Sequence, residues 1–347
     1  MKEVSKKETS VDKKRCAAWR LTIRIMLFTG PLWLIVALYF HDDPYMVIRN
    51  YRIYDSKVML NESYVGWHIY LNNRDSIPFN SFIMGNSCTM AFRCTEWEKY
   101  LKGGRAVRLF GNIENMMALY KKLLALEREH ANIKNVLMIL DKSSLSKIFL
   151  QSGYSFVLPP EISGDSPLNE QLDYLQGFMS PDFLFPYLKY RLTKTVTPSM
   201  KAFNTYGRIR NPINNDAINP REKMIEKEGE QYWISHKNDF PPRDGKRVIS
   251  CPVISGQQEA LLLDIAKVLR RNSTSVKIVI SPDYKQAYIN PLDVRILKRI
   301  FGKNNIFDFT GINQYTADKH NFYEKGHYRP LLGNKLLKTI YKTPYTL

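Results

Sequence analysis

Residues 82–92 read FIMGNSCTMAF, a short apolar run that ends in Gly85-Asn86-Ser87. An apolar run that meets a glycine, a polar residue and a serine is typical of the turn from a β-strand into a helix. Such a turn can cap the helix, bind an anion or present a nucleophilic serine. The rest of the chain must decide which of these roles belongs to Ser87.

The pattern of a short apolar strand followed by a helix recurs along the chain. Besides the strand at 81–84, strands are expected at 105–110 (RAVRLF), 135–140 (NVLMIL), 276–280 (VKIVI) and 306–309. Apolar residues at helical spacing predict helices at 114–129, 256–271 and 292–300, and a final helix from about residue 330. Strands that alternate with helices predict an α/β fold, with a parallel sheet flanked by helices.

Reactive groups of such sheets lie beyond the carboxyl ends of the strands. The residues at those ends are Gly85-Asn86-Ser87, Gly111-Asn112, Asp141, Ser281 and the segment after Phe309. We therefore expect them to converge on one edge of the sheet.

Residues 152–248 interrupt the alternation. This stretch holds the pairs Pro159-Pro160 and Pro241-Pro242, an aromatic-rich segment from Phe178 to Tyr190, and a polar, charged segment at 211–239. Its composition predicts an insertion or cap that is partly loop. The aromatic segment can stack on sugar rings, but core packing is the commoner role of such side chains.

The N-terminus has the pattern of a membrane anchor. Residues 1–24 hold eight lysines and arginines against three acidic residues, and the sixteen residues from Ile25 to Phe40 carry no charge. Adding residues 21–23, with Arg24 reaching back to the headgroups, gives the ~20 residues that a membrane-spanning helix needs. The positive-inside rule then predicts a cytoplasmic tail (1–24), a transmembrane signal anchor (25–41) and an extracytoplasmic domain (42–347) on the cytoplasmic membrane.

Two other interpretations of this segment are weaker. A cleaved signal peptide requires a small-x-small site after the apolar run, whereas residues 38–41 (LYFH) are bulky throughout. A buried helix of a soluble domain does not account for the step in charge across the segment.

The formal net charge of +18 indicates an anionic partner. Nucleic acid, an anionic membrane surface and an acidic polymer are the candidates. The extracytoplasmic placement, and a sequence without zinc-finger or aromatic RNA-binding motifs, exclude nucleic acid from our prediction. Four cysteines do not form a disulfide framework. Cys88 and Cys94 are either a pair in an oxidising compartment or two buried thiols.

The segment after the last expected strand carries two of the six histidines, each preceded by a carboxylate. Glu324 lies three residues before His327, and Asp318 lies two before His320. A serine nucleophile needs a base to take its proton, and the base needs a carboxylate to hold its tautomer. The sequence thus predicts a triad of Ser87, His327 and Glu324, with Asp318 and His320 as the reserve acid and base.

The succession of Gly-x-Ser, Gly-Asn and acid-x-x-His at these positions resembles the SGNH (GDSL-like) hydrolase superfamily. The resemblance is greatest to its membrane-anchored branch, which includes the protein of D-alanyl-lipoteichoic acid biosynthesis and the SGNH-domain proteins of alginate O-acetylation. It covers about residues 78–150 and 250–347 and implies a flavodoxin-like sheet. By this resemblance Ser87 matches the nucleophile, and Glu324 and His327 match the acid and base. Gly111 matches the glycine whose N–H joins that of Ser87 in the oxyanion hole.

The chain departs from the superfamily's pattern at three positions. Asn86 and Glu324 stand where aspartate is usual. Asp141 stands where an asparagine of the oxyanion hole is usual, and a carboxylate there would repel an oxyanion. We therefore give Asp141 no catalytic role and expect it to be structural or placed differently.

These features lead to two functional hypotheses. The first is a membrane-anchored serine acyltransferase or esterase acting on O-acyl groups of a cell-surface or exported polysaccharide, and the resemblance implies an integral membrane O-acyltransferase as its donor partner. The alternative is a non-catalytic SGNH-like scaffold that binds glycan or that acyltransferase. Because the sequence has no metal-binding motif and no phosphate-binding glycine loop, we expect no metal and no cofactor.

Overall fold

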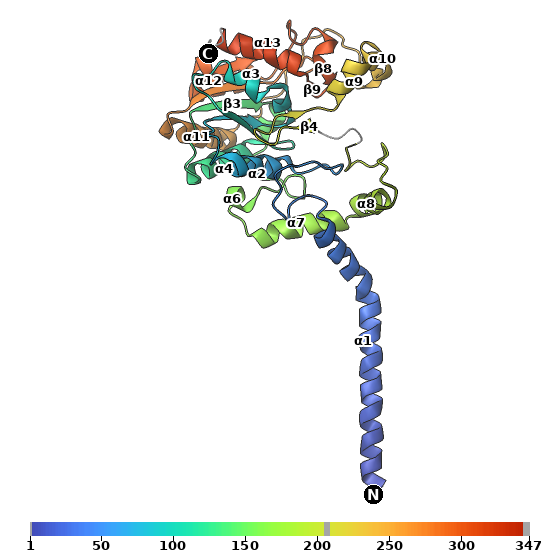
Figure 1. Cartoon of the computed structure of the whole chain (residues 1–347). Helices are drawn as coiled ribbons and strands as arrows, with labels where there is room; N and C mark the ends of the chain where they lie inside the picture. The colour runs from blue at the N-terminus through green and yellow to red at the C-terminus, as the bar shows by residue number, and fades with distance from the viewer. Residues whose placement is uncertain (1, 205–208, 343–347) are drawn as a thin grey trace.

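The computed structural model, which describes residues 2–204 and 209–342, has a long helix that leads into an α/β domain (Figure 1). Helix α1 spans Lys2–Asp42. Its part from Ala17 to Asp42, 26 residues with a mean hydropathy of 1.9, is long and apolar enough to cross a membrane, and its most apolar stretch is not buried in the domain. The apolar N-terminal helix predicted from the sequence is present and suits either a signal anchor or a signal peptide.

Five parallel strands form the central sheet in the order β2-β1-β3-β6-β7. The strands are β1 (Ser81–Gly85), β2 (Ala106–Phe110), β3 (Asn135–Leu140), β6 (Ser275–Ile280) and β7 (Ile306–Asp308). Every residue of β1, β2 and β3 is buried, as expected for a sheet that is covered on both faces. The predicted α/β fold with a parallel sheet is confirmed.

Helices cover both faces of this sheet. Side chains alternate along each strand, so Phe82 and Met84 face one layer while Ile83 faces the other. The first layer holds α2 (Glu62–Asn73), α4 (Met116–Arg128), α11 (Gly256–Arg271) and α12 (Pro291–Phe301). The second layer holds η1 (Ser87–Ala91), α3 (Cys94–Glu98) and α13 (Pro330–Tyr341).

The strand order places a ligand-binding edge beside β1. Counting only the strands of this sheet, the order is 2-1-3-4-5, in which the direction of winding reverses between β1 and β3. Such a switch point leaves a crevice beyond the carboxyl ends of the two strands. The residues that follow them are Asn86 and Asp141, and the Nδ2 of Asn86 donates a hydrogen bond to Oδ2 of Asp141 at 2.7 Å. These two predicted strand ends do converge.

The insertion at 152–248 is more helical than its composition indicated. It divides into two parts that pack in different regions of the domain. In its first part, α7 (Pro167–Met179) and α8 (Pro181–Thr193) pack in the aromatic cluster around the end of α1. The short helix α6 (Pro160–Ser163) packs instead against the layer that holds α4. In the aromatic cluster, Phe178, Phe183 and Tyr187 are buried, so these aromatic side chains form core. Its second part comprises β4 (Ile209–Arg210), β5 (Ala217–Ile218), α9 (Arg221–Glu228), α10 (Gln231–Ser235) and η2 (Lys237–Asp239).

Four of the remaining elements follow carboxyl ends of strands of the sheet: α5 (Lys142–Ser146), η4 (Lys319–Asn321), β8 (Phe322–Glu324) and β9 (His327–Tyr328). The short helix η3 (Lys303–Asn305) directly precedes β7, at the opposite edge. Strands β8 and β9 form a separate antiparallel hairpin after the last strand of the main sheet.

Candidate active site

Ser87 is the first residue of η1, directly after the turn that ends β1. Gly85 in this turn has a φ of 138°, and a Cβ there would lie 2.2 Å from the carbonyl oxygen of Ile139, so only glycine fits. Asn86 caps η1, because its side-chain oxygen accepts a hydrogen bond from the N–H of Cys88 at 2.9 Å. The serine is therefore held, half-buried, on a turn fixed at both ends.

Asp141 stabilises the same turn from β3. One carboxylate oxygen accepts the N–H of Ser144 at 2.7 Å in the capping box of α5, and the other accepts the side-chain amide of Asn86. These contacts agree with the structural role expected for Asp141.

Glu324 and His327 lie opposite each other on the β8–β9 hairpin. Their separation of three residues therefore corresponds to a two-residue hairpin connection, Lys325-Gly326. The hairpin directs both side chains toward the carboxyl edge of the sheet, where Ser87 stands.

Ser87, His327 and Glu324 form a continuous chain of hydrogen bonds. The Oγ of Ser87 lies 2.7 Å from Nε2 of His327, and Nδ1 of His327 is hydrogen-bonded to Oε1 of Glu324. The second carboxylate oxygen of Glu324 accepts the N–H of Gly326 at 2.7 Å. This is the order of contacts in which a carboxylate orients a histidine base toward a serine.

The carboxyl group of Glu324 is suited to staying ionised. Burial raises its pKa, but the hydrogen bond and charge of His327, with the N–H of Gly326, outweigh that effect and bring the pKa below its ordinary value. An ionised acceptor fixes the Nδ1–H tautomer of the imidazole and leaves Nε2 free to accept the serine proton.

The predicted reserve pair, Asp318 and His320, does not contact Ser87. Both ring nitrogens of His320 already face carboxylates. Nδ1 of His320 contacts Oδ1 of Asp318 at 2.6 Å, and its Nε2 contacts Oε2 of Glu230 at 2.7 Å. Because both ring nitrogens face carboxylates, His320 has none left for Ser87. The structure thus brings Glu324, and not Asp318, to the histidine that contacts the serine.

The second part of the insertion holds the hairpin in place. The hydroxyl of Tyr232 donates to the carbonyl oxygen of Tyr323 at 2.7 Å, and Nε1 of Trp233 donates to that of Phe322 at 3.3 Å. Glu222 of α9 forms an ion pair with Arg329 at 2.6 Å. Sequence reasoning missed these positioning residues, because nothing in their local pattern links them to a segment about ninety positions later.

Gly111 does not present a free N–H in this arrangement. Its N–H donates to the carbonyl oxygen of Gly85 at 3.1 Å and so continues the pairing of β2 with β1. The next residue, Asn112, lines the same cavity as Ser87 and His327. Its side-chain amide makes only a long contact, 3.4 Å, to the carbonyl oxygen of Ser155. Asn112 is thus the better candidate donor to an oxyanion, and its place after a strand end was the signal that could have identified it.

A cavity of about 340 Å³ opens at Ser87 and His327. Its walls mix amide, hydroxyl and carboxylate groups with apolar side chains. The remaining lining residues are Met59, Leu60, Glu62, Met90, Asn112, Ile113, Ser155, Phe156, Asn204 and Asn219. Glu62 is ion-paired at 2.7 Å with Arg210 of the insertion. Most of the wall thus comes from the segment after α1 and from the insertion.

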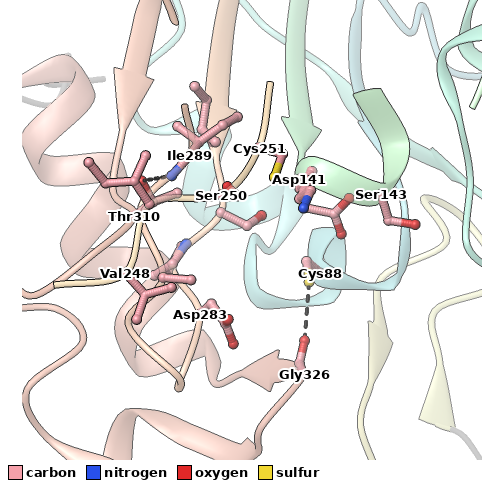
Figure 2. Close-up of a pocket in the computed structure, with 16 residues that line it drawn as sticks. Cys88, Asp141, Ser143, Val248, Ser250, Cys251, Asp283, Ile289, Thr310 and Gly326 are labelled. Atoms are coloured by element: carbon pink, nitrogen blue, oxygen red, sulfur yellow. Dashed lines mark hydrogen bonds between the residues drawn. The ribbon is translucent and has the colours of Figure 1, made fainter. Parts of the chain in front are cut away.

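A larger cavity, of about 550 Å³, is bordered by Gly326 of the β8–β9 turn (Figure 2). Figure 2 shows Cys88 and Gly326 at its border, where the thiol of Cys88 donates to the carbonyl oxygen of Gly326 at 3.5 Å. Val248, Ile289 and other apolar side chains dominate its wall. Neither Ser87 nor His327 lines this cavity, so it is separate from the hydrogen-bonded triad.

The cysteines of the domain are free thiols. Cys88 and Cys94 are buried and unpaired with each other, and Cys251 is exposed. Burial raises the pKa of Cys88 far above its ordinary value, so the thiol next to Ser87 stays protonated and is a poor nucleophile. Within residues 2–204 and 209–342, no group of three or more histidine, cysteine or acidic side chains is placed to hold a metal ion.

No family model matches the chain, and no curated protein sequence matches it. What is established is an α/β domain with a five-stranded parallel sheet, behind a long apolar N-terminal helix, without a family assignment.

Proposed function

We propose that this chain is a membrane-anchored serine acyltransferase or esterase that acts on O-acyl groups of a cell-surface or exported polysaccharide. The observation that carries the proposal is the hydrogen-bonded series Ser87–His327–Glu324, formed by residues that are about 240 positions apart at its extremes. The resemblance of their motifs to the SGNH superfamily supports the same reaction class. The apolar helix supports a single-pass placement in the cytoplasmic membrane, with the domain outside.

The reaction proceeds through an acyl-serine. His327 takes the proton of Ser87 while Oγ attacks the carbonyl carbon of the acyl donor, and a tetrahedral intermediate forms. Its collapse expels the donor's alkoxide, which receives the proton from His327. A sugar hydroxyl or water, deprotonated in turn by His327, then attacks the acyl-serine and releases Ser87. Glu324 orients the imidazole and stabilises its cationic form.

The wall of the cavity at Ser87 is mostly apolar, but it carries several side-chain amides that suit a carbohydrate. Sugar hydroxyls both donate and accept hydrogen bonds, and the amides of Asn112, Asn204 and Asn219 do the same. Asn112 is also the proposed donor to the tetrahedral oxyanion. The basic tail accounts for +5 of the net charge of +18, so the rest of the chain is also cationic and suited to an anionic polymer.

A non-catalytic scaffold is the second candidate. The observation that favours it is the N–H of Gly111, which is engaged by Gly85 and not available to an oxyanion. The contact between Ser87 and His327 argues against it, because a protein that only binds glycan gains nothing from an oriented base. The scaffold would bind glycan or a membrane O-acyltransferase through the same cavity.

Covalent labelling separates the two candidates. The full chain in membranes is treated with a fluorophosphonate probe, and wild type is compared with Ser87→Ala and His327→Ala. We expect labelling of wild type, none of Ser87→Ala, and a rate at least about 10²-fold lower for His327→Ala. His320→Ala is the matched control and should label like wild type. A folded wild type that does not label would favour the scaffold, and labelling that persists in Ser87→Ala would place the nucleophile elsewhere.

A further inference from the structure

The last turns of α1 are built into the domain. Tyr39 is 0% exposed, its hydroxyl donates to Oε1 of Gln171 on α7 at 2.9 Å, and its ring lies 5.5 Å from that of Phe178. Asp42 accepts the hydroxyl of Tyr187 on α8 at 2.8 Å and pairs with Arg191 at 2.7 Å. No free linker therefore separates the apolar helix from α7 and α8.

The length of the uncharged segment brings these contacts to the membrane boundary. Sixteen uncharged residues, 25–40, span about 24 Å at ~1.5 Å per residue, whereas the hydrocarbon core of a bilayer is ~30 Å thick. With residues 21–23 added, the segment up to Phe40 matches this thickness. Tyr39 then lies at the edge of the hydrocarbon, and the parts of α7 and α8 that touch the end of α1 lie at the same depth.

Helices α7 and α8 each carry an exposed apolar stripe. On α7, Leu168 is 67%, Leu172 53% and Met179 36% exposed, and on α8, Phe185 is 68% and Leu192 84% exposed. Within each helix these residues are spaced by four or seven positions, so they form one line along its surface. We call these five residues the interfacial face. Figure 1 shows α7 lying across the end of α1, where that helix joins the domain.

We infer that the interfacial face rests in the lipid bilayer, at the boundary between headgroups and acyl chains. Helices that lie in this plane bury an apolar side and keep polar residues toward water. The exposed Lys189 and Lys194 of the α8 end can reach lipid phosphates, while Asp165 and Asp182 of the same region oppose them. Apolar burial, more than charge, therefore drives the contact. We infer lipid, and not a protein, as the partner of the interfacial face, because the apolar helix α1 brings these stripes to the surface of the membrane.

This placement sets the candidate active site close to the membrane-proximal segments. The segments that follow α1 and α8 meet in an antiparallel bridge between Val58 and Phe203. Their next residues, Met59, Leu60 and Asn204, line the cavity of Ser87. The bilayer contact thus fixes two segments that shape the wall of the cavity, whichever function that cavity has.

Fluorescence quenching in vesicles tests the inference. The full chain is reconstituted in phosphatidylcholine and phosphatidylglycerol vesicles, with Cys251→Ser to remove the exposed thiol and Cys16→Ser to leave no cysteine in the tail. An environment-sensitive maleimide dye is attached at Leu172→Cys or Leu192→Cys. Leu263→Cys on α11, 38% exposed on another part of the domain, is the matched control. Each label is quenched separately by doxyl lipid and by aqueous iodide.

We expect the labels at 172 and 192 to be quenched several-fold more by doxyl lipid than the label at 263, and several-fold less by iodide. Equal iodide quenching at all three positions would overturn the inference. Protection from iodide in native membranes, combined with exposure in pure lipid vesicles, would also overturn it, because a protein and not lipid would then cover the face. The outcome does not depend on whether Ser87 is a nucleophile.

Discussion

Glu324 reaches His327 from the facing strand of a hairpin, and one of its two carboxylate oxygens is held by the N–H of Gly326. The motif of the superfamily has the shorter aspartate at this position. Here the longer side chain still makes the contact to Nδ1, because the hairpin and not a helical turn sets the separation. The longer side chain therefore does not disrupt the contact with His327.

Exchange of the two candidate acids distinguishes their roles. In Glu324→Gln the amide can stabilise the wrong imidazole tautomer and cannot stabilise the cation, so we expect fluorophosphonate labelling of Ser87 to slow by up to about 10⁴-fold. Asp318→Asn should label at the wild-type rate, because Asp318 contacts His320. Equal effects of both substitutions would contradict the assignment of the acid.

At the scale of single residues, the sequence predicted the triad contacts but not the contacts of Gly111 and Asn112. The motif spacing placed Ser87, Glu324 and His327 on one edge, and the structure brings these three together. The sequence did not reveal that the N–H of Gly111 donates a hydrogen bond to the carbonyl oxygen of Gly85, because the register of β1 and β2 decides that contact. For the same reason Asn112, one residue further on, did not emerge as a donor.

At the scale of elements, periodic segments were predictable and irregular ones were not. Helix α11 has the bounds expected from its apolar spacing, and β3 has the bounds of its apolar run. Helix α2 was missed because most of its length is buried, which removes the contrast between faces. Helices α9 and α10 are short and depend on docking to the β8–β9 hairpin, a contact that no local pattern reveals.

One close approach between elements governs the turn that carries Ser87. A Cβ on Gly333 of α13 would lie 1.9 Å from the carbonyl oxygen of Ala91, the last residue of η1. Gly333→Ala should therefore displace η1, lower the free energy of unfolding by about 1–3 kcal/mol and slow the labelling of Ser87. Thermal unfolding and probe labelling measure the two effects.

Gly256→Ala is the control for this substitution. Gly256 opens α11, and apart from its chain neighbours and the backbone of its own helix no described atom lies within 4 Å of the position that an added methyl group would take. Alanine should therefore leave labelling unchanged and raise stability slightly. Wild-type stability in Gly333→Ala would show that α13 can retreat from η1 without loss.

At the scale of the whole molecule, the joint between α1 and the domain contains a buried acid. Glu170 of α7 is 6% exposed, and among the described residues its Oε1 has no hydrogen-bond partner. Burial raises the pKa of Glu170 from 4.5 to about 8, and the charge of Glu161 adds to the rise. In the folded protein the group therefore stays protonated through neutral pH.

This raised pKa predicts a loss of stability as the pH rises. Between about pH 4.5 and pH 8 the unfolded chain releases the proton that the folded chain keeps, so the free energy of unfolding falls across this window and levels off above it. Glu170→Gln, which cannot ionise, should show a smaller fall in Tm over the same range. The exposed Glu226→Gln is the control, and identical pH profiles of Glu170→Gln and wild type would contradict the prediction.

Because no linker separates α1 from the domain at Asp42, the thickness of the bilayer affects the orientation of the domain. A helix joined to its domain by the contacts of Tyr39 and Asp42 cannot swivel alone, so any tilt of the helix tilts the domain with it. Thicker or thinner membranes change the tilt that matches the hydrophobic length. In the proposed membrane placement, lipid composition would then change the angle at which Ser87 faces its proposed polysaccharide substrate.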